Sequence, residues 1–517
     1  MLPTTEQAEI VAAAKSTNEN LMISAYAGCA KTTTLEMLAK ALPEPGLALA
    51  FNVKIKKDME EKLPGWTVMT LNGLGHRAWA NTIGRRLEID SRKLGKLITA
   101  LGSKLSERDD WDIIRMLVTY AMQEGLVPSN SPYANRARIT DTTDNWLDIA
   151  TKHWLDCSER HVELARNVLI KSIRMGYEGI ITYDEQIYLS ACHGGVFPRF
   201  AHVLVDEAQD LSAINHAQVA RTAAGRIFVA GDAKQAVYAF RGAHGKSIEA
   251  MRELRPSWMD LPLTTTFRCP KRIVERQQSH APGFKAFHTN AEGVIYDISK
   301  KTPSGPDFGE RHESGHTWSW HHVQSVSSGD IAILSRFNAQ VVKMAFQLLR
   351  QGIACHMLGR DIGKSLVLLS KKILPNDNTP AEVCIAAITA WKDAQIAAAT
   401  EAGSEEKVAG ITDRAESLLA VLEGAGAHSA GELRNRLEIL FAKDSGKVTL
   451  STIHRAKGLE WDCVVHLDPW RIPSRHALRQ AKRGDDTQLN QEYNLLYVCE
   501  TRSRNVLILA NAQDFVG

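Results

Sequence analysis

Short apolar runs alternate with longer, charged segments over the first part of the chain. The apolar runs cover residues 21–27, 47–53 and 66–71, and helix-forming sequence follows each of the first two. A strand buried on both faces of a sheet reads as a continuous apolar run, so this alternation predicts a parallel α/β sheet. Ligands gather at the carboxyl ends of the strands in such a sheet, which makes the residues after each run the first candidates for a site.

Two longer stretches lack this alternation. Residues 85–177 and 371–446 have amphipathic helical periodicity and few strand signals, which predicts two helical insertions. Residues 280–328 are rich in His, Gly and Ser, and this composition predicts a loop. Strand character returns in the remaining segments, so the pattern predicts two α/β lobes, each interrupted by helices.

Length and composition agree with this division. A chain of 517 residues is too long for one ordinary domain, and its net charge of +3 excludes no class of partner. No apolar run reaches the length of a membrane span, and MLPTTEQAEI has no secretory-signal character. The eight cysteines contain no CxxC pair, and His312, His316, His321 and His322 lack acids or cysteines at metal-ligand spacing. We therefore expect a cytoplasmic protein with reduced thiols, without a structural metal and without a membrane partner.

Residues 21–34, with the sequence LMISAYAGCAKTTT, combine a strand, a small-residue loop and the start of a helix. Backbone N–H groups at a helix N-terminus attract phosphate, while Lys31 can reach the outer phosphates and the Thr32 hydroxyl can hold Mg²⁺. The usual pattern for such a loop, G-x-x-x-x-G-K-[ST], has glycine where this chain has Ala25 and Ala30. The loop favours a nucleotide site, and an ordinary strand–turn–helix with a surface lysine is the alternative.

A second candidate lies in VLVDEAQDLS, at residues 203–212. Asp206 stands at the end of the expected strand, where a carboxylate can hold Mg²⁺ directly or through water. Glu207 beside it can polarise a water molecule for attack on a γ-phosphate. Two surface acids after a core strand are the alternative, which the phosphate loop earlier in the chain disfavours.

Together these blocks resemble the UvrD/Rep family of superfamily 1 DNA helicases, and the chain looks like a compact phage or bacterial member. The resemblance covers nearly the whole chain, and the blocks follow the family's order. The most specific blocks are GDAKQAVYAFRGA, STIHRAKGLEWD and EYNLLYVCETRSR, because several fixed positions occur in register. The remaining blocks are TTEQAEIV, AYAGCAKTT, LAFNVKIKKDMEEKL, TLNGLGH, VDEAQD and TTFRCP.

The resemblance implies a P-loop NTPase fold with two RecA-like parallel-sheet lobes, each carrying a helical insertion. It also implies ATP and Mg²⁺ as cofactors and single-stranded or tailed duplex DNA as the partner, whereas protein partners stay unknown. We expect the first lobe at residues 1–84 and 178–266 with its insertion at 85–177, and the second at 267–370 and 447–517 with its insertion at 371–446.

The resemblance also assigns nucleotide roles to residues whose chemistry suits them. Lys31 would contact the β- and γ-phosphates, and Thr32 and Asp206 would hold Mg²⁺. Glu207 would be the general base, and Gln235 would sense the γ-phosphate or the attacking water. The other nucleotide candidates are the loop residues Ala27, Gly28, Cys29, Ala30 and Thr33, the adenine contacts Gln7 and Phe267, the cationic fingers Arg268 and Arg502 across the cleft, and Glu460 near the ribose or between the lobes.

Contact with DNA needs aromatic platforms for bases and hydroxyl, amide or basic partners for phosphates. Tyr238 and Phe240 follow Gln235 closely, so the block that senses nucleotide would also present rings to bases. Core packing is the alternative for each ring. The other DNA-binding candidates are Phe51, Asn52, Thr70, Asn72, Arg241, Thr452, His454 and Lys457.

The function implied by the resemblance is an ATP-dependent DNA helicase that moves 3′→5′ on single-stranded DNA and unwinds duplexes in replication, repair or recombination. A translocase that strips bound protein with little unwinding is one alternative. A nucleotide-binding module with impaired hydrolysis is another, because Ala30 adds a Cβ where the backbone approaches phosphate. Every ionisable catalytic group is nevertheless present, which favours an active but slower ATPase.

Overall fold

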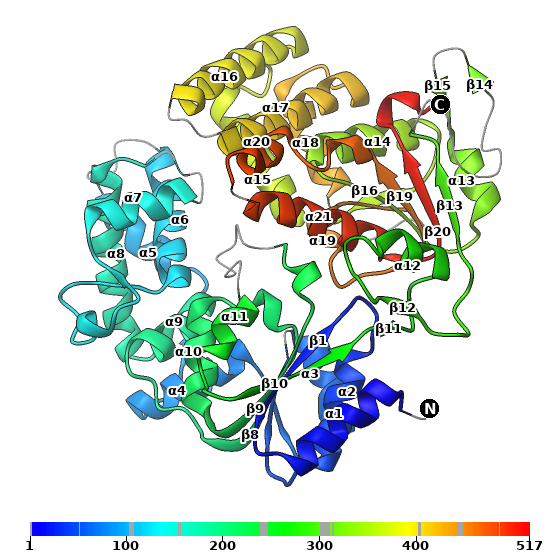
Figure 1. Ribbon diagram of the computed structural model, residues 1–517. Helices are drawn as coiled ribbons and strands as arrows, with labels where there is room; N and C mark the ends of the chain where they lie inside the picture. The colour runs from blue at the N-terminus through cyan, green and yellow to red at the C-terminus, as the bar shows by residue number, and fades with distance from the viewer. Residues whose placement is uncertain are drawn as a thin grey trace. The chain divides into compact units, whose positions relative to one another are not determined.

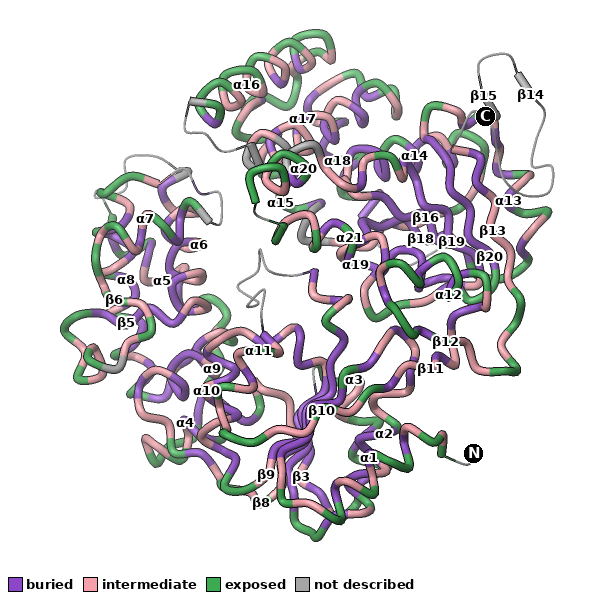
Figure 2. The backbone as a smooth tube through the Cα atoms, viewed as in Figure 1, coloured by how far each residue is buried: buried purple, intermediate pink, exposed green. Residues whose placement is uncertain are grey.

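The computed structural model describes two units, Met1–Leu263 and Thr264–Gly517, and each is built around its own sheet (Figure 1). Figure 2 shows that strands of both sheets are among the most continuously buried segments. The residues that the structure describes are 3–50, 52–102, 108–152, 155, 157–237, 247–299, 311–312, 315–401, 405–441, 448–484 and 486–516.

Six strands form the sheet of the first unit. They are β1 (Asn20–Ala25), β2 (Leu47–Ala50), β3 (Thr67–Thr70), β8 (Phe200–Val205), β9 (Ala223–Gly231) and β10 (Trp258–Leu263). Their order is β10-β1-β9-β8-β2-β3, and every neighbouring pair is parallel. Because all strands point the same way, the segments that follow β1, β8 and β9 meet at one edge of the sheet.

Helices cover both faces of this sheet (Figure 1). One face carries α1 (Thr5–Ser16) and α2 (Lys31–Ala41), and the other carries α4 (Leu71–Ile83), α9 (Tyr183–Cys192) and α10 (Ala213–Thr222). The unit also contains α3 (Val53–Lys62) and α11 (Ser247–Arg252). This two-sided cover explains why the strands are apolar on both faces.

A helical section lies between α4 and α9 in the chain. It contains α5 (Lys93–Thr99), α6 (Arg108–Glu124), α7 (Thr143–Lys152) and α8 (Glu159–Tyr177), with the strand pairs β4 (Glu88–Ile89) with β7 (Ile180–Ile181) and β5 (Leu126–Val127) with β6 (Ile139–Thr140). Its apolar core includes the fully buried Trp146 and also takes in Trp79 of α4 and Tyr188 of α9. The section is therefore joined to the helices of the sheet by one shared core.

A buried ion pair reinforces this junction. Lys93 of α5 and Glu185 of α9 are fully buried, and Lys93 Nζ lies 2.7 Å from Glu185 Oε2. Lys93 Nζ also donates to the carbonyl oxygens of Ser172 and Ile180, and Glu185 accepts from Ser172 Oγ and the Thr182 N–H. Burial lowers the pKa of Lys93, and the charge of Glu185 opposes that shift. The pair ties α5 and α8 to α9 in one arrangement, since both charges are compensated.

The second unit repeats the sheet architecture. Its strands β13 (Val294–Asp297), β16 (Ile331–Ser335), β17 (Cys355–Met357), β18 (Val448–Thr452), β19 (Trp461–Leu467) and β20 (Ser503–Ala510) form a parallel sheet in the order β13-β20-β19-β16-β18-β17. Two short pairs are β11 (Thr265–Thr266) with β12 (Lys285–Ala286) and β14 (Arg311–His312) with β15 (Gly315–His316).

The helices of the second unit include three in the range of the predicted second insertion, α16 (Ala381–Glu401), α17 (Glu405–Ala425) and α18 (Ala430–Leu440). The others are α12 (Lys271–Gln277), α13 (Trp320–Val326), α14 (Asn338–Arg350), α15 (Arg360–Ile373), α19 (Ile453–Ala456), α20 (Arg475–Lys482) and α21 (Thr487–Glu500). Buried residues of α14, α15, α17 and α18 share one apolar core with the sheet.

The two parallel six-stranded sheets confirm the predicted α/β fold class and are consistent with two RecA-like lobes. The segment boundaries stay predictions. Within the described residues, none of the helices combines the length and apolarity that a bilayer crossing requires.

The loop predicted for residues 280–328 is wrong in part, because β12, β13, β14, β15 and α13 lie in this range. β13 forms an edge of the second sheet, and α13 follows Trp318, which is fully buried. A four-residue edge strand is too short to show the alternation of apolar and polar residues that marks a strand. Its extended conformation depends on backbone pairing with β20.

We predict that Lys93→Met destabilises the first unit by about 3–5 kcal/mol, because Glu185 would stay buried without its cation. Chemical denaturation followed by circular dichroism measures the loss. Lys56→Met is the matched control, since Lys56 and Glu60 form a partly exposed pair that contributes less than about 1 kcal/mol. Equal losses in the two variants would contradict the structural role of the buried pair.

Candidate functional site

The phosphate-loop sequence joins β1 to α2 at the carboxyl edge of the first sheet. The Tyr26 N–H donates to the carbonyl oxygen of Leu263 in β10, which anchors the start of the loop. Gly28 and Ala30 have positive φ angles of 71° and 56°, so the chain turns sharply before Lys31. The first N–H groups of a helix have no partner inside that helix, so the loop directs the N-terminus of α2 to this edge.

The backbone of Ala30 is in the left-handed conformation, with φ 56° and ψ 41°. Glycine adopts this conformation freely, whereas a Cβ makes it cost about 1–2 kcal/mol. The sequence predicted crowding between this Cβ and a phosphate. The structure adds a backbone cost that exists without any ligand, and strain of this kind is concentrated at functional sites.

The other loop candidates differ in exposure. The side chains of Ala27 and Cys29 are buried, so a phosphate contact from either residue would use its backbone amide. Gly28 is partly exposed, and Thr33 is exposed on the first turn of α2. The nucleotide roles of these positions stay predictions.

The structure brings the predicted acids to this loop. Thr32 Oγ1 donates to Asp206 Oδ2 at 2.9 Å, and Lys31 Nζ lies 3.5 Å from Glu207 Oε1. Asp206 is buried at the end of β8, and desolvation together with the charge of Glu207 raises its pKa to about 6. One lysine, one hydroxyl and two carboxylates therefore meet at the carboxyl edge of the sheet, where β1 and β8 end on either side of β9.

The pair of Thr32 and Asp206 suits a magnesium ion. Mg²⁺ prefers oxygen ligands, and in nucleotide sites one or two protein oxygens hold it together with waters and phosphates. The described part of the chain contains no group of three or more His, Cys, Asp or Glu residues that would enclose a metal by itself. A cation beside Asp206 would favour the ionised carboxylate and so oppose the effect of burial. The residues fit a magnesium ion that shares its coordination with a phosphate.

Gln209 and Asp232, which the sequence analysis did not single out, connect Glu207 to Gln235. Gln209, in the short helix η3 (Ala208–Asp210), donates from Nε2 to Glu207 Oε2. Gln209 Oε1 accepts the Asp232 N–H at 2.9 Å, and Asp232 Oδ2 accepts from Gln235 Nε2 at 2.6 Å. Both residues lie inside the blocks VDEAQD and GDAKQ, which was the available signal. The chain of contacts links the ends of the neighbouring strands β8 and β9.

The predicted adenine contact Gln7 is buried and holds α1 against α2. Its Oε1 accepts the Thr4 N–H at 3.0 Å, and its Nε2 donates to Thr34 Oγ1 at 3.1 Å. These partners fix the position of the amide, and its role toward adenine stays a prediction.

In the second unit, Arg268 and Glu460 form an ion pair. Arg504 Nη1 lies 3.9 Å from Glu460 Oε1, and the ring of Phe267 packs against Phe287 with centroids 4.8 Å apart. The structure therefore brings Arg268 and Glu460 together, whereas their roles toward nucleotide stay predictions.

Arg502 is buried, with 1% of its surface exposed. Its guanidinium donates to the carbonyl oxygens of Val498 and Leu459 and to Thr501 Oγ1. A cationic finger must reach a phosphate, so this role would require Arg502 to exchange those acceptors. The side chain of Arg268 is 25% exposed and would need a smaller rearrangement.

Three DNA-binding candidates of the first unit lie at the ends of parallel strands or just after them. Asn52 follows β2, Thr70 ends β3, and Asn72 lies in the first turn of α4. Asn52 and Thr70 accept backbone N–H groups and so cap α3 and α4. Asn72 Nδ2 donates to the carbonyl oxygen of Tyr183 at 3.1 Å, which connects α4 to the start of α9. All three therefore have local structural roles, and their contacts with DNA stay predictions.

The remaining DNA-binding candidates divide into two groups. Thr452 ends β18, and His454 and Lys457 lie in α19 and directly after it. Four candidates fall outside the residues that the structure describes, namely Phe51, Tyr238, Phe240 and Arg241.

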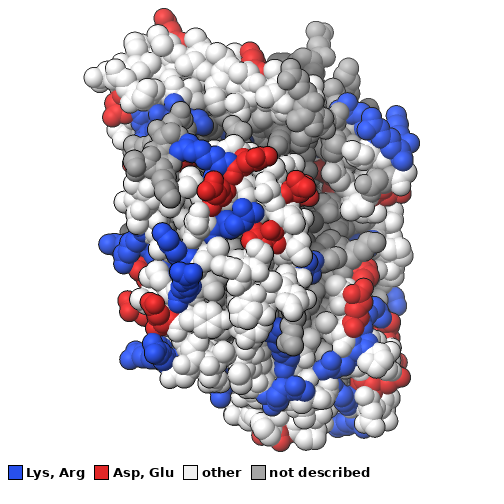
Figure 3. All heavy atoms as spheres, turned by 90° about the vertical axis from the view of Figure 1, so that its left-hand side faces the viewer, with Lys and Arg blue, Asp and Glu red and all other residues white. Residues whose placement is uncertain are grey.

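The face drawn in Figure 3 carries Lys and Arg side chains interspersed with Asp and Glu rather than one broad basic patch. The small net charge of +3 agrees with this mixture. Binding of a nucleic acid on this face would therefore depend on local groups more than on a long-range field.

Two family models match the chain. They are the UvrD/REP helicase N-terminal domain, over residues 165–256, and the UvrD-like helicase C-terminal domain, over residues 398–514. The chain is also similar to F-box DNA helicase protein 1 of Schizosaccharomyces pombe, with 25% identity over 98% of this chain and 57% of that protein.

Two helicases of Mycobacterium tuberculosis are similar as well. ATP-dependent DNA helicase UvrD2 is 26% identical over 60% of this chain and 47% of its own length. ATP-dependent DNA helicase UvrD1 is 25% identical over 95% of this chain and 80% of its own length. The chain thus spans about half the length of the yeast protein and of UvrD2.

We predict that Ala30→Gly raises the free energy of unfolding of the first unit by about 1 kcal/mol, because glycine accepts φ 56° without strain. Calorimetry should show a Tm increase of about 2–4 °C. Ala27→Gly is the control, since Ala27 does not have a positive φ and glycine there should lower stability. A lower Tm for Ala30→Gly would mean that the loop gains more from the methyl group than it loses in strain.

Proposed function

Because the chain belongs to the UvrD/REP helicase family, we propose that it is an ATP-dependent DNA helicase that moves 3′→5′ on single-stranded DNA and unwinds duplexes. The observation that carries the proposal is the meeting of Lys31, Thr32, Asp206 and Glu207 at one edge of the first sheet. ATP and Mg²⁺ would be its cofactors, single-stranded or tailed duplex DNA its partner, and replication, repair or recombination its setting.

This cluster has the chemistry to hold and hydrolyse a nucleoside triphosphate. Lys31 and the amides at the start of α2 bind the outer phosphates. Thr32 and Asp206 would hold Mg²⁺, whose positive charge would offset the charge that develops on the transferred phosphoryl group. Glu207 accepts a proton from the attacking water, and the water oxygen bonds to the γ-phosphorus as the bond to the β-phosphate oxygen breaks.

The ion pair between Lys31 and Glu207 couples phosphate binding to the general base. Lys31 Nζ faces Glu207 Oε1, while Gln209 donates to Oε2. When Lys31 turns to a phosphate, Glu207 Oε1 can accept the proton of the water, and Gln209 keeps the carboxylate oriented. The same Gln209 leads through Asp232 to Gln235, so a change at the phosphates is passed to the segment after β9. That segment contains the predicted base-stacking rings.

DNA contacts would follow the carboxyl ends of the strands. Asn52, Thr70 and Asn72 supply hydroxyl and amide groups in the first unit, and Lys457 supplies a cation in the second. Each neutralised phosphate should lower the logarithm of the binding constant by about 0.7 per decade of salt on single strands. The direction of movement rests on the block GDAKQAVYAFRGA, whose aromatic–Arg–Gly ending is typical of the 3′→5′ branch.

A nucleotide-binding module with weak hydrolysis is a second candidate function. The observation that favours it is the left-handed Ala30, because its Cβ lies in the loop where phosphate must approach the backbone. A turnover number that rises strongly in Ala30→Gly would favour this alternative.

We predict that Glu207→Gln lowers ATP hydrolysis by about 10²–10⁴-fold while ATP still binds, because only the proton acceptor is lost. Lys31→Ala should instead weaken ATP binding, since it removes the cation that faces the phosphates. Steady-state phosphate release and titration with a fluorescent ATP analogue separate the two effects. Hydrolysis at the parental rate by Glu207→Gln would overturn the assignment of the base.

We predict ATP-dependent strand displacement from a partial duplex with a 3′ single-stranded tail, and little from the same duplex with a 5′ tail. The reason is the 3′→5′ direction that the motif after Gln235 implies. A gel assay with both substrates and a Lys31→Ala control measures it. Displacement only from the 5′-tailed substrate would reverse the polarity, and ATP hydrolysis without displacement from either substrate would favour a protein-stripping translocase.

A further inference from the structure

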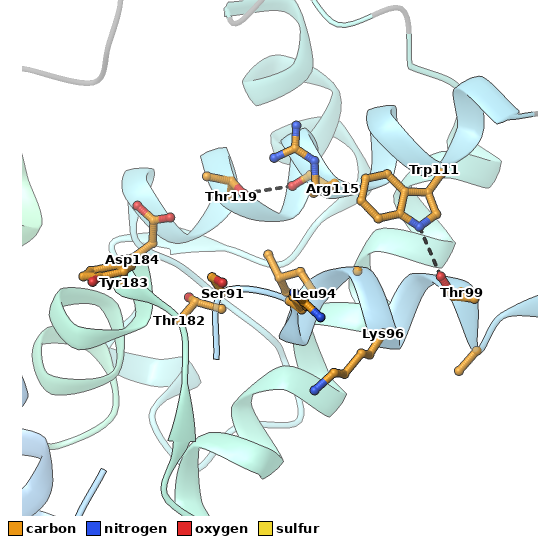
Figure 4. A pocket seen from close by; sticks show the side chains of 13 residues that line it. Ser91, Leu94, Lys96, Thr99, Trp111, Arg115, Thr119, Thr182, Tyr183 and Asp184 are labelled. Atoms are coloured by element: carbon orange, nitrogen blue, oxygen red, sulfur yellow. Dashed lines mark hydrogen bonds between the residues drawn. The ribbon is translucent and has the colours of Figure 1, made fainter. Parts of the chain in front are cut away.

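A groove in the helical section of the first unit carries a second set of side chains suited to a nucleic acid. Its volume is about 830 Å³, and residues of α5, of α6 and of the start of α9 line it (Figure 4). Leu94, Gly95 and Ala100 supply apolar surface. In Figure 4, Trp111 lies at one end and Tyr183 at the other. The groove therefore offers an aromatic ring at each end.

Trp111 is fixed as a platform rather than buried in the core. It is partly exposed, and its Nε1 donates to Thr99 Oγ1 at 3.4 Å. A Cβ added at Gly95 would lie 3.1 Å from Trp111 Cζ2, so the absence of a side chain at Gly95 lets the indole approach α5. The guanidinium carbon of Arg115 lies 5.8 Å from the ring centroid. This geometry is that of an aromatic ring flanked by a cation, which suits a stacked base with a nearby phosphate.

The other end of the groove adjoins a predicted DNA contact. Tyr183 is 63% exposed, and its carbonyl oxygen accepts from Asn72 Nδ2 at 3.1 Å. A strand held at Asn72 would therefore meet the ring of Tyr183 next and then enter the groove.

Three cations line the groove. Lys96 Nζ lies 2.7 Å from Asp90 Oδ2, and Arg115 Nε lies 3.7 Å from Asp112 Oδ1. The hydrogen bond from Lys96, the Arg92 N–H and the charges of both residues lower the pKa of Asp90, so Arg92 also faces this acid. Exposed pairs of this kind are weak and can be exchanged for a phosphate, so Arg92 and Arg115 are placed to neutralise one.

One acid, Asp184, also lines the groove. Gln123 Nε2 donates to Asp184 Oδ1 at 3.3 Å, and burial raises the pKa of Asp184. The hydrogen bond from Gln123 holds this side chain in place beside Tyr183.

We propose that this groove binds a nucleotide unit of single-stranded DNA, with a base stacked on Trp111 and a phosphate beside Arg92 and Arg115. The inference rests on the proposed function, because it takes the strand to continue from Asn72 over Tyr183. A free nucleotide offers the same base and phosphate, so the test must separate the two sources.

Trp111→Ala should weaken the binding of long oligothymidylates by about 5- to 150-fold, the effect of losing one stacked base. Oligothymidylates too short to reach the groove from Asn72 should bind as they do to the parent protein. Fluorescence anisotropy with the full chain and a series of lengths measures both, and Trp111→Phe should restore most of the affinity. Arg92→Ala is a second test that leaves the apolar core intact. It should lower the slope of the logarithm of the binding constant against the logarithm of salt concentration by about 0.7.

Trp470→Ala is the matched control, because Trp470 is 63% exposed and stacks with Arg471 in the second unit. Parental affinity in Trp111→Ala, or equal weakening in Trp470→Ala, would overturn the inference. Thymidine monophosphate could instead bind in a way that depends on Trp111, while the effect of Trp111→Ala does not depend on oligonucleotide length. This result would assign the groove to a free nucleotide and overturn the proposal that it binds single-stranded DNA. Failure of the parent protein to bind any oligothymidylate would overturn the proposed function itself.

Discussion

The contact between Thr32 and Asp206 is the constraint on which the rest of the site depends. It exists because the parallel strands β1 and β8, on either side of β9, end at the same edge of one sheet, so Thr32 Oγ1 comes within 2.9 Å of the buried Asp206 Oδ2. Burial raises the pKa of Asp206 toward 6, and a cation beside it offsets that cost. The proposed nucleotide chemistry follows from this arrangement, because a phosphate would offset the charge of Lys31 and magnesium would offset that of Asp206.

Compensated charge also holds the neighbouring parts of the first unit in place. The buried pair of Lys93 and Glu185 fixes the helical section to α9, and α9 begins at Tyr183, whose carbonyl oxygen contacts Asn72. The proposed strand path from Asn72 to the groove therefore runs over one firmly connected body. The hydrogen bonds from Glu207 through Gln209 to Asp232 also connect separate elements, since they join the segments that follow β8 and β9.

The fold class could be predicted from the sequence, because buried parallel strands appear as continuous apolar runs and amphipathic helices appear as apolar residues at helical spacing. The sequence was not sufficient for β13, whose place depends on pairing with β20, nor for the left-handed backbone of Ala30, which composition does not reveal. The motifs and their order were enough to predict that the phosphate loop and the acids lie at one edge of the sheet. They could not show that Gln209 bridges two motifs or that Arg502 is buried among carbonyl oxygens, because both facts depend on side-chain geometry.

We propose that the edge holding Thr32 and Asp206 is an ATPase whose turnover responds to a DNA strand. The most direct measurement is the rate of Mg²⁺-dependent ATP hydrolysis by the full chain, with and without saturating single-stranded DNA. We expect a measurable basal rate that rises clearly when DNA is added. A rate that is the same in both conditions, or hydrolysis that is absent in both, would contradict the proposal.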